Sequence, residues 1–171
     1  MPEHAPSLND QPAEAWLAVF EAHEQAAVRY AWSLTGNAES AEELIQTTLV
    51  ELVSRAVPCP EHAKPYLLRC LRNRAALNAR SRDAASRAMH GRLGGFANAC
   101  VSTSEPRSED ARLLLEQLSP DEREVVVLHL RSGLTFAEIA RVLEQPIGTV
   151  SSRYTRTLQR LRRASHAASA V

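Results

Sequence analysis

The sequence lacks several features that mark specialised classes of protein. Only 5% of its 171 residues are aromatic, so a hydrophobic core must be built mainly from aliphatic side chains. Basic and acidic side chains number 20 each, which leaves no net charge to suggest a uniformly charged binding surface. No apolar run approaches the ~18 residues that a transmembrane helix requires, and the acidic N-terminus does not resemble a signal peptide. We therefore expect a soluble, cytoplasmic protein.

Cysteine is also scarce. The three cysteines, Cys59, Cys70 and Cys100, are odd in number and widely spaced, which argues against a disulfide framework. Cys59 and His62 are close enough in sequence to share a metal ion, but a zinc site needs about four ligands and no second pair follows. We expect free thiols, no metal and no cofactor.

Charges of each sign are gathered into blocks. Residues 1–53 hold nine acidic side chains and one basic one, whereas residues 54–92 hold nine basic and two acidic ones. Residues 93–124 are again acidic and residues 125–171 again basic. The two basic blocks can face a polyanion such as nucleic acid, whereas the acidic blocks would be repelled by it or would face something else.

Apolar spacing predicts three helices in the first half of the chain. Apolar residues recur at steps of three and four from Trp16 to Leu34, and Gly36 is suited to a left-handed helix end. A second helix is expected over 38–55 and a third from Pro65, because proline fits the first helical position. The expected inward positions are Trp16, Phe20, His23, Ala27, Tyr30 and Leu34, then Ala41, Leu44, Ile45, Thr48 and Leu52, then Leu67, Leu68, Leu71 and Ala75.

Two capping boxes mark helix starts in the second half. Ser119–Glu122 and Thr135–Glu138 each place a hydroxyl residue three positions before a glutamate, which is the pattern of reciprocal capping. A third helix is expected from Pro146, and no strand-like alternation competes anywhere in the chain. The fold class we predict is therefore all-α. The expected apolar positions are Val126, Val127 and Leu130, then Phe136, Ile139, Ala140 and Leu143, then Ile147, Val150, Tyr154, Leu158 and Leu161.

The segment 145–163 contains several arginines and no acidic residue. A short helix, a tight turn and this longer helix have helix-turn-helix geometry, in which the start of the second helix enters the DNA major groove. Arginines and hydroxyls suit phosphates and base edges. A surface helix with a solvated basic face is the alternative interpretation. The polar stripe of this helix contains Thr149, Ser152, Arg153, Arg156 and Arg160.

The chain is expected to form two small helical domains joined by a flexible linker. The linker has no sustained period and is rich in alanine, glycine and serine. The predicted boundaries are a tail at 1–15, a first domain at 16–83, the linker at 84–110, a second domain at 111–164 and a tail at 165–171.

These segments resemble one known family. The stretch "LSPDEREVVVLHLRSGLTFAEIARVLEQPIGTVSSRYTRTLQRLRR" is similar to domain four of bacterial RNA polymerase sigma factors. The stretches "YAWSLTGNAESAEELIQTTLVELVSR" and "PYLLRCLRNRAALNARSR" are similar to domain two. A linker replaces the central sigma domain, as in the extracytoplasmic-function (ECF) group. The resemblance implies an alternative sigma factor, not an enzyme by itself, that directs promoter-specific initiation.

The resemblance also implies partners and site residues. The partners are core RNA polymerase, through its clamp coiled coil and flap, promoter DNA and an anti-sigma factor. The implied residues for the minus-thirty-five element are Thr135, Glu138, Thr149, Ser151, Ser152, Arg153, Arg156 and Arg160; for the minus-ten element they are Arg69, Arg72, Asn73, Asn78 and Arg80; for core polymerase they are Glu42, Glu43, Leu44, Gln46 and Thr47.

Some positions depart from the family pattern. Thr47 and Leu49 stand where the family commonly has an acid and an aromatic, Asn78 where it has an aspartate, and Ser151 where it often has a basic residue. Three alternatives stay open. They are a stand-alone helix-turn-helix regulator, which would dimerise on a palindromic site, a degenerate sigma-like protein-interaction module, and a thiol redox sensor.

Overall fold

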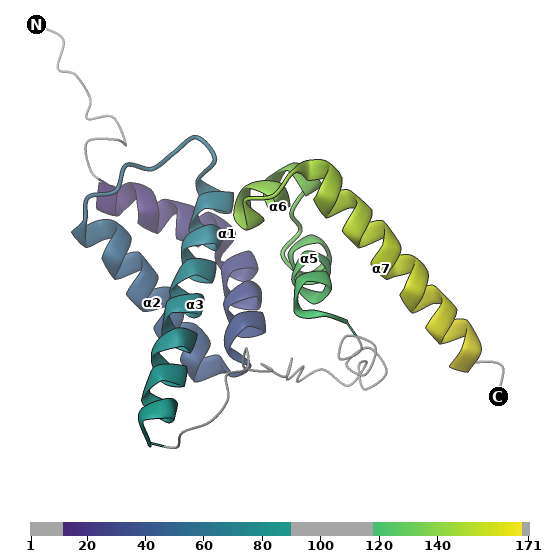
Figure 1. The fold of residues 1–171 in the computed structure, drawn as a ribbon. Coiled ribbons are helices and arrows are strands. Elements are labelled where there is room, and N and C mark those ends of the chain that lie inside the picture. The colour runs from purple at the N-terminus through teal and green to yellow at the C-terminus, as the bar shows by residue number, and fades with distance from the viewer. Residues whose placement is uncertain (1–11, 90–117, 169–171) are drawn as a thin grey trace, which may run out of the picture. The chain divides into compact units, whose positions relative to one another are not determined.

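The computed structural model describes residues 12–89 and 118–168, and every regular element in these ranges is an α-helix (Figure 1). The chain divides into two compact units. Unit 1 contains α1 (Pro12–Thr35), α2 (Ala38–Ser54) and α3 (Ala63–Met89). Unit 2 contains α5 (Pro120–Leu130), α6 (Phe136–Leu143) and α7 (Ile147–Ala168). The all-α prediction is confirmed. Most of the predicted linker and both chain ends lie outside the described residues, although α3 extends past residue 84.

The three helices of unit 1 enclose an aliphatic core with two buried aromatic residues. α1 packs against both α2 and α3, and Trp16, Tyr30 and Leu71 are completely buried between them. The predicted inner stripe of α2 is confirmed at all five positions, since Ala41, Leu44, Ile45, Thr48 and Leu52 are buried.

α1 differs from its prediction at one point. His23 has a non-helical backbone (φ −129°, ψ 16°), so that α1 is two helical segments joined by a kink (Figure 1). The buried face of α1 changes its helical phase at His23. Of the predicted inward positions, Phe20, His23 and Leu34 are only half-buried, whereas Ala27 is fully buried. Apolar spacing predicted the helical segments but could not reveal the change of direction between them.

A left-handed glycine and two hydrogen bonds fix the connections of unit 1. Gly36 has φ 83°, the left-handed conformation that its place at the end of α1 predicted. The Asn37 side chain accepts a hydrogen bond from the backbone N–H of Ser40 at 2.7 Å and so begins α2. The Trp16 indole N–H donates to the Val57 carbonyl at 2.8 Å, which ties the loop before α3 to α1.

Both predicted capping boxes are present in unit 2. The Ser119 N–H donates to Glu122 Oε2 at 2.9 Å, and the Glu122 N–H donates to Ser119 Oγ at 3.3 Å. Thr135 and Glu138 repeat the exchange at 2.8 and 3.3 Å. These boxes satisfy N–H groups that have no partner within their own helices, so α5 and α6 begin at defined residues.

The core of unit 2 lies between α5, α6 and α7. Val125, Leu128 and Ile139 are completely buried. His129, Phe136 and Tyr154 form an aromatic cluster beside them with ring centroids 4.7 to 5.2 Å apart. The prediction that Tyr154 packs in the core rather than stacking on bases agrees with this cluster.

Two expected apolar positions of unit 2 are exposed. Leu130 is 60% exposed and Ile147 is 53% exposed. Leu130 is the last residue of α5 and Ile147 the first of α7. The apolar stripe of each helix therefore extends one position beyond the helices that cover it.

Candidate nucleic-acid and polymerase interfaces

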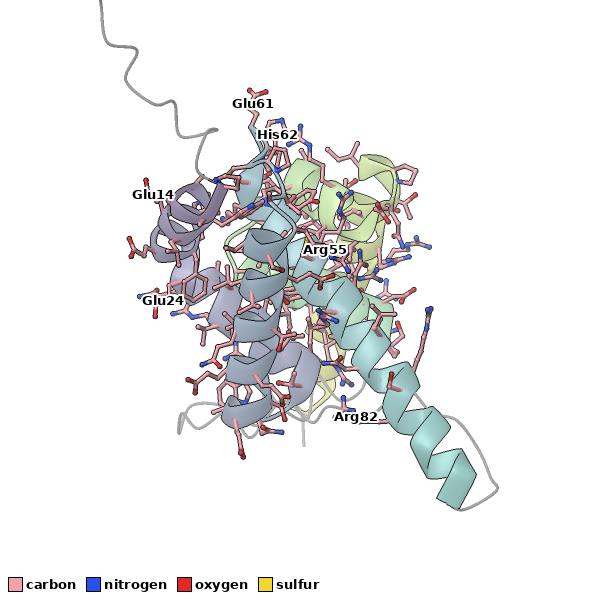
Figure 2. All side chains as sticks on the ribbon, turned by 90° about the vertical axis from the view of Figure 1, so that its left-hand side faces the viewer. Glu14, Glu24, Arg55, Glu61, His62 and Arg82 are labelled. Carbon is pink, nitrogen blue, oxygen red and sulfur yellow. The ribbon has the colours of Figure 1, made fainter. Side chains whose placement is uncertain are left out.

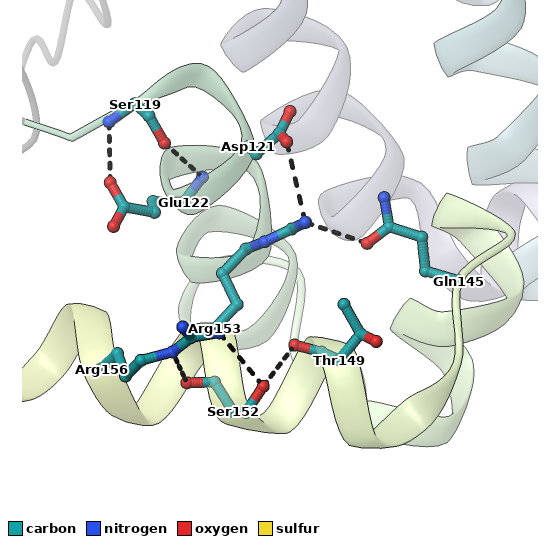
Figure 3. A network of polar contacts seen from close by, with 8 residues as sticks. All are labelled: Ser119, Asp121, Glu122, Gln145, Thr149, Ser152, Arg153 and Arg156. Atoms are coloured by element: carbon teal, nitrogen blue, oxygen red, sulfur yellow. Dashed lines mark hydrogen bonds and ion pairs between the residues drawn. The ribbon is translucent and has the colours of Figure 1, made fainter.

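The start of α7 presents a row of small hydroxyl groups. Thr149 and Ser152 are exposed, and the Ser152 hydroxyl donates to the Thr149 carbonyl at 3.1 Å. The exposed Arg156 lies along the same face, with its Nε donating to the Ser152 carbonyl at 3.2 Å (Figure 3). Hydroxyls beside a guanidinium form a surface that suits phosphates and base edges.

Arg153 differs from Arg156 in its surroundings. Its side chain is only 20% exposed. One guanidinium nitrogen donates to Gln145 Oε1 at 2.9 Å, and the other lies 3.7 Å from Asp121 Oδ2 (Figure 3). Arg153 thus connects α7 to the preceding turn and to the start of α5.

Arg160 makes a second connection between the same two helices. Its Nη2 donates to Glu122 Oε2 at 2.7 Å, the same oxygen that accepts from the Ser119 N–H. Partial burial raises the pKa of Glu122, but the hydrogen bonds from Arg160 and Ser119 outweigh it, so that this pKa lies below its usual value. The shared carboxylate joins the start of α5 to α7.

Three other predicted minus-thirty-five residues make short-range contacts. Thr135 and Glu138 hold each other in the capping box of α6, where the Thr135 hydroxyl also donates to Glu138 Oε2 at 2.8 Å. Ser151 is half-buried, and its hydroxyl donates to the Gly148 carbonyl at 3.2 Å. These contacts make all three part of the motif's own framework.

The turn into α7 places Gln145 beside Arg153. Glu144 adopts a left-handed conformation (φ 54°), and the Gln145 N–H then donates to the Ala140 carbonyl at 3.0 Å. Val150 is completely buried one turn into α7. The turn therefore leads the chain into α7 with Val150 inward and the side chains of Thr149 and Ser152 outward.

The outer face of α3 gathers part of the predicted minus-ten set. Asn73 and Arg80 are exposed, and the Arg69 guanidinium lies 5.0 Å from the centre of the Tyr66 ring. Asn78 is exposed as well. It lies about 140° round the helix from Asn73, because five residues separate them. Arg72 is half-buried.

Arg74 anchors α3 to α2. Its guanidinium donates to the Glu51 carboxylate, which also accepts from Arg55 at 2.9 Å. Arg74 and Glu51 are 27% and 31% exposed. Figure 2 shows Glu14 and Glu24 together on α1, well away from Arg82 on α3.

The exposed face of α2 contains most of the predicted polymerase contacts. Glu42, Glu43, Gln46 and Thr47 are exposed, and Gln46 Nε2 donates to Glu42 Oε1 at 3.1 Å. Leu44 is the exception, because it is 1% exposed and packs in the core of unit 1. A side chain buried in this way leaves almost no surface for a partner in this structure.

The two described cysteines do not favour a redox site. Cys59 and Cys70 are free and half-buried, and burial raises the pKa of both thiols. A raised pKa lowers the fraction of reactive thiolate. Cys100 lies outside the described residues. Within 12–89 and 118–168 no group of three or more His, Cys, Asp or Glu side chains is arranged to hold a metal ion, and no helix there is long and apolar enough to cross a bilayer.

Comparison with known families identifies both units. The family described as "Sigma-70 region 2" matches residues 19–85, and "Sigma-70, region 4" matches residues 108–161. The chain belongs to the sigma-70 family. It is similar to the "ECF RNA polymerase sigma factor EcfG" of Rhodopseudomonas palustris (strain TIE-1), with 28% identity over 138 residues, 77% of this chain and 75% of that protein.

Two solved structures are similar to this chain in fold. One is RpoE of Bartonella quintana, crystallised with the anti-sigma factor NepR, at a TM-score of 0.66 and 25% identity over 88% of this chain and 96% of that one. The other is CnrH in complex with the cytosolic domain of CnrY, at a TM-score of 0.64 and 22% identity over 94% of this chain and 96% of that one. The protein is therefore an alternative sigma factor of the ECF group that directs transcription initiation.

Sequence inspection of this sigma factor missed three residues at these surfaces. Val50 is 66% exposed on the α2 face that bears Glu42 and Glu43, and a valine on the polar side of an amphipathic helix could have signalled it. Asp121 and Gln145 contact Arg153. No pattern in the sequence could have paired them, because Asp121 lies on another helix.

Proposed function

We propose that this sigma factor binds core RNA polymerase through the exposed face of α2 and reads promoter DNA through α7 and α3. The polymerase supplies the chemistry of RNA synthesis, and the sigma factor is not an enzyme by itself. It acts in the cytoplasm, where an anti-sigma factor holds it inactive. The similarity to a sigma factor solved with its anti-sigma factor supports that last partner.

The observation that carries the proposal is the division of charge in unit 1. The α2 face holds Glu42 and Glu43 with the exposed Val50 about two turns further along, whereas the α3 face holds Asn73 and Arg80. An acidic face that also exposes an apolar side chain suits a protein partner and is repelled by DNA. A face of asparagine and arginine suits the DNA backbone and unpaired bases. We assign the first to the polymerase clamp coiled coil and the second to the minus-ten element.

Unit 2 supplies the second DNA contact. Its helix-turn-helix exposes Thr149, Ser152 and Arg156 at the start of α7, where such motifs enter the major groove. We assign these residues to the minus-thirty-five element. The rest of unit 2 contacts the polymerase flap, so that both promoter elements are held by one complex. Trapping an unpaired minus-ten base costs a few kcal/mol of unstacking, which the combined contacts offset.

Co-elution of the full-length protein with core RNA polymerase on a sizing column tests the proposal. The wild type is expected to form a one-to-one complex. The double variant Glu42→Lys/Glu43→Lys and the single variant Val50→Asp are expected to lose it. The matched control is Glu21→Lys/Glu24→Lys, which makes the same change of charge at exposed positions of α1.

The control separates a specific contact from overall charge. Equal loss in the control pair would reject α2 as the polymerase-binding face. A folded wild-type protein that forms no complex at low or moderate salt would contradict polymerase binding itself.

A further inference from the structure

Two arginines of α7 pair with acidic residues of α5 within unit 2. The side chains of Arg153 and Arg160 both reach from α7 to the first turn of α5, where they meet Asp121 and Glu122. The Arg153 side chain is 20% exposed and the Arg160 side chain 53% exposed. Arg156, on the same helix, instead lies along α7 and contacts Ser152.

The burial of Arg153 limits what it can contact. Two of its guanidinium nitrogens already have partners, Gln145 Oε1 at 2.9 Å and Asp121 Oδ2 at 3.7 Å. A guanidinium reads guanine through two parallel donors. If Arg153 were to read a base in this way, it would have to give up Gln145 and Asp121, leave its half-buried position and adopt another rotamer.

The two partners of Arg153 lie in different parts of unit 2. Gln145 belongs to the turn that begins α7, and Asp121 belongs to the first turn of α5. One side chain therefore joins the turn, α5 and α7 (Figure 3). An arginine in a planar, multi-partner contact restrains a helix in direction and rotation, because its donors have fixed geometry.

We propose that Asp121 and Gln145 are positioning residues for DNA reading. They hold Arg153 as a strut that sets the orientation of α7, and the bases of the minus-thirty-five element are read by Thr149, Ser152 and Arg156. This inference rests on the proposed function. It also predicts the opposite of a simple electrostatic argument. Asp121 carries negative charge near the proposed DNA-binding face, so removal of that charge would ordinarily strengthen DNA binding, whereas we expect it to weaken binding.

The test uses holoenzyme formed from core RNA polymerase and the full-length chain. A DNA duplex is first selected from a random-sequence pool by the wild type, and a scrambled duplex serves as its non-specific counterpart. Gln145→Ala is expected to lower affinity for the selected duplex by about tenfold, since it removes a hydrogen bond of a charged group. Asp121→Asn is expected to lower it by about twofold, since its ion pair is long and exposed. Affinity for the scrambled duplex is expected to stay within about twofold for both variants.

Two further variants complete the comparison. Arg153→Lys keeps the charge but not the planar contacts, and it should match Gln145→Ala. Glu21→Gln removes an exposed acid from α1 in unit 1 and should change neither affinity. If Asp121→Asn instead strengthens binding to both duplexes, the acid merely screens the arginines and the proposal is overturned. Unchanged specific binding in Gln145→Ala overturns it as well.

A measurement without DNA separates this inference from the proposed function. Side-chain ¹⁵N relaxation of the free protein should show the Arg153 guanidinium to be more ordered than that of Arg156. Gln145→Ala should remove the difference. Equal mobility of the two arginines in the wild type would refute the strut even if the promoter assays succeed. If relaxation shows an ordered Arg153 guanidinium but the holoenzyme selects no DNA sequence, the proposed function is contradicted and the contacts of Arg153 are not.

Discussion

The two basic helices of this sigma factor, α3 and α7, are anchored in different ways. α3 is tied to α2 by Arg74, which the sequence did not assign to DNA, while the assigned residues Asn73 and Arg80 stay exposed. α7 is tied to α5 by Arg153 and Arg160, two residues that the sequence did assign to DNA. An arginine on a DNA-facing helix can thus serve the fold or the ligand, and residue type alone does not decide which.

The largest expected effect concerns the anchor of the loop before α3. Trp16→Ala removes a completely buried indole and its bond to the Val57 carbonyl. We expect a loss of about 3–5 kcal/mol from the unfolding free energy of unit 1. Urea unfolding measured by fluorescence checks this, because Trp16 and Trp32 are the only tryptophans of the chain and Trp32 remains as the reporter. Hydrogen exchange in α5–α7 should stay unchanged; if it accelerates, the two units do not unfold independently.

The next prediction compares the stability that the Arg74–Glu51 pair gives to unit 1 with the stability that the Arg153–Asp121 pair gives to unit 2. Glu51→Gln leaves the half-buried Arg74 without its carboxylate and should cost about 1–2 kcal/mol, after allowance for partial solvent exposure. Asp121→Asn should cost less than about 0.5 kcal/mol, because Asp121 is 67% exposed and its ion pair is long. Helix-resolved hydrogen exchange measures both. Equal losses would remove the distinction between a stabilising anchor in unit 1 and an orienting one in unit 2.

Each basic helix also carries one buried polar atom without a hydrogen-bond partner among the described residues. On α3 it is Arg74 Nε and on α7 it is Thr157 Oγ1. Thr157→Val replaces the hydroxyl with a methyl of similar size and should stabilise unit 2 by about 1 kcal/mol. Thermal unfolding followed by circular dichroism detects the gain. Thr157→Ser is the matched control, since it keeps the hydroxyl, and it should be no more stable than the wild type.

The stability of unit 2 should also depend on pH through Glu122. Its pKa is lower in the folded state, so its contribution is present above the ordinary glutamate pKa near 4.5 and is lost as pH falls from there toward the folded value. Glu122→Gln should flatten this part of the profile. Unfolding of α5–α7 measured by hydrogen exchange between pH 6 and pH 3 checks it, and an unchanged profile in the variant would contradict the Arg160–Glu122 interaction.

The smallest effect lies in the two connections that precede the basic helices. Ala56 (φ 47°) and Glu144 (φ 54°) both adopt the left-handed conformation that glycine tolerates best. Replacement by glycine removes roughly 1 kcal/mol of strain but adds entropy to the unfolded chain. We expect a net gain below about 1 kcal/mol at each site, read from thermal midpoints. A marked loss at Glu144 alone would show that its side chain supports the turn.

Local patterns predicted most of the fold. The five buried positions of α2, the two capping boxes and the left-handed Gly36 all depend on neighbours within four residues, and short-range rules describe such neighbours well. Leu44 shows two rules in conflict. Its helical phase placed it in the core, which its burial confirms, whereas the family motif placed it at the polymerase contact.

The partners of the site residues could not be predicted in the same way. Arg153 meets Asp121 across 32 positions of sequence, through a long side chain with many rotamers. Periodicity places such a residue on the polar stripe but says nothing of what lies opposite. The kink at His23 could not be predicted for a related reason. Both segments of α1 keep helical spacing, although their axes differ.

The carboxylate of Glu122 has a consequence for protein engineering. One of its oxygens accepts both the Ser119 N–H, which starts α5, and the Arg160 guanidinium on α7. A chimera that transplants only α6 and α7 into another sigma factor would carry the residues that we assign to DNA without the α5 residues that we propose orient them. The smallest transferable cassette for promoter choice therefore begins at Ser119, and chimeras cut before and after α5 should differ in fidelity while bearing identical recognition helices.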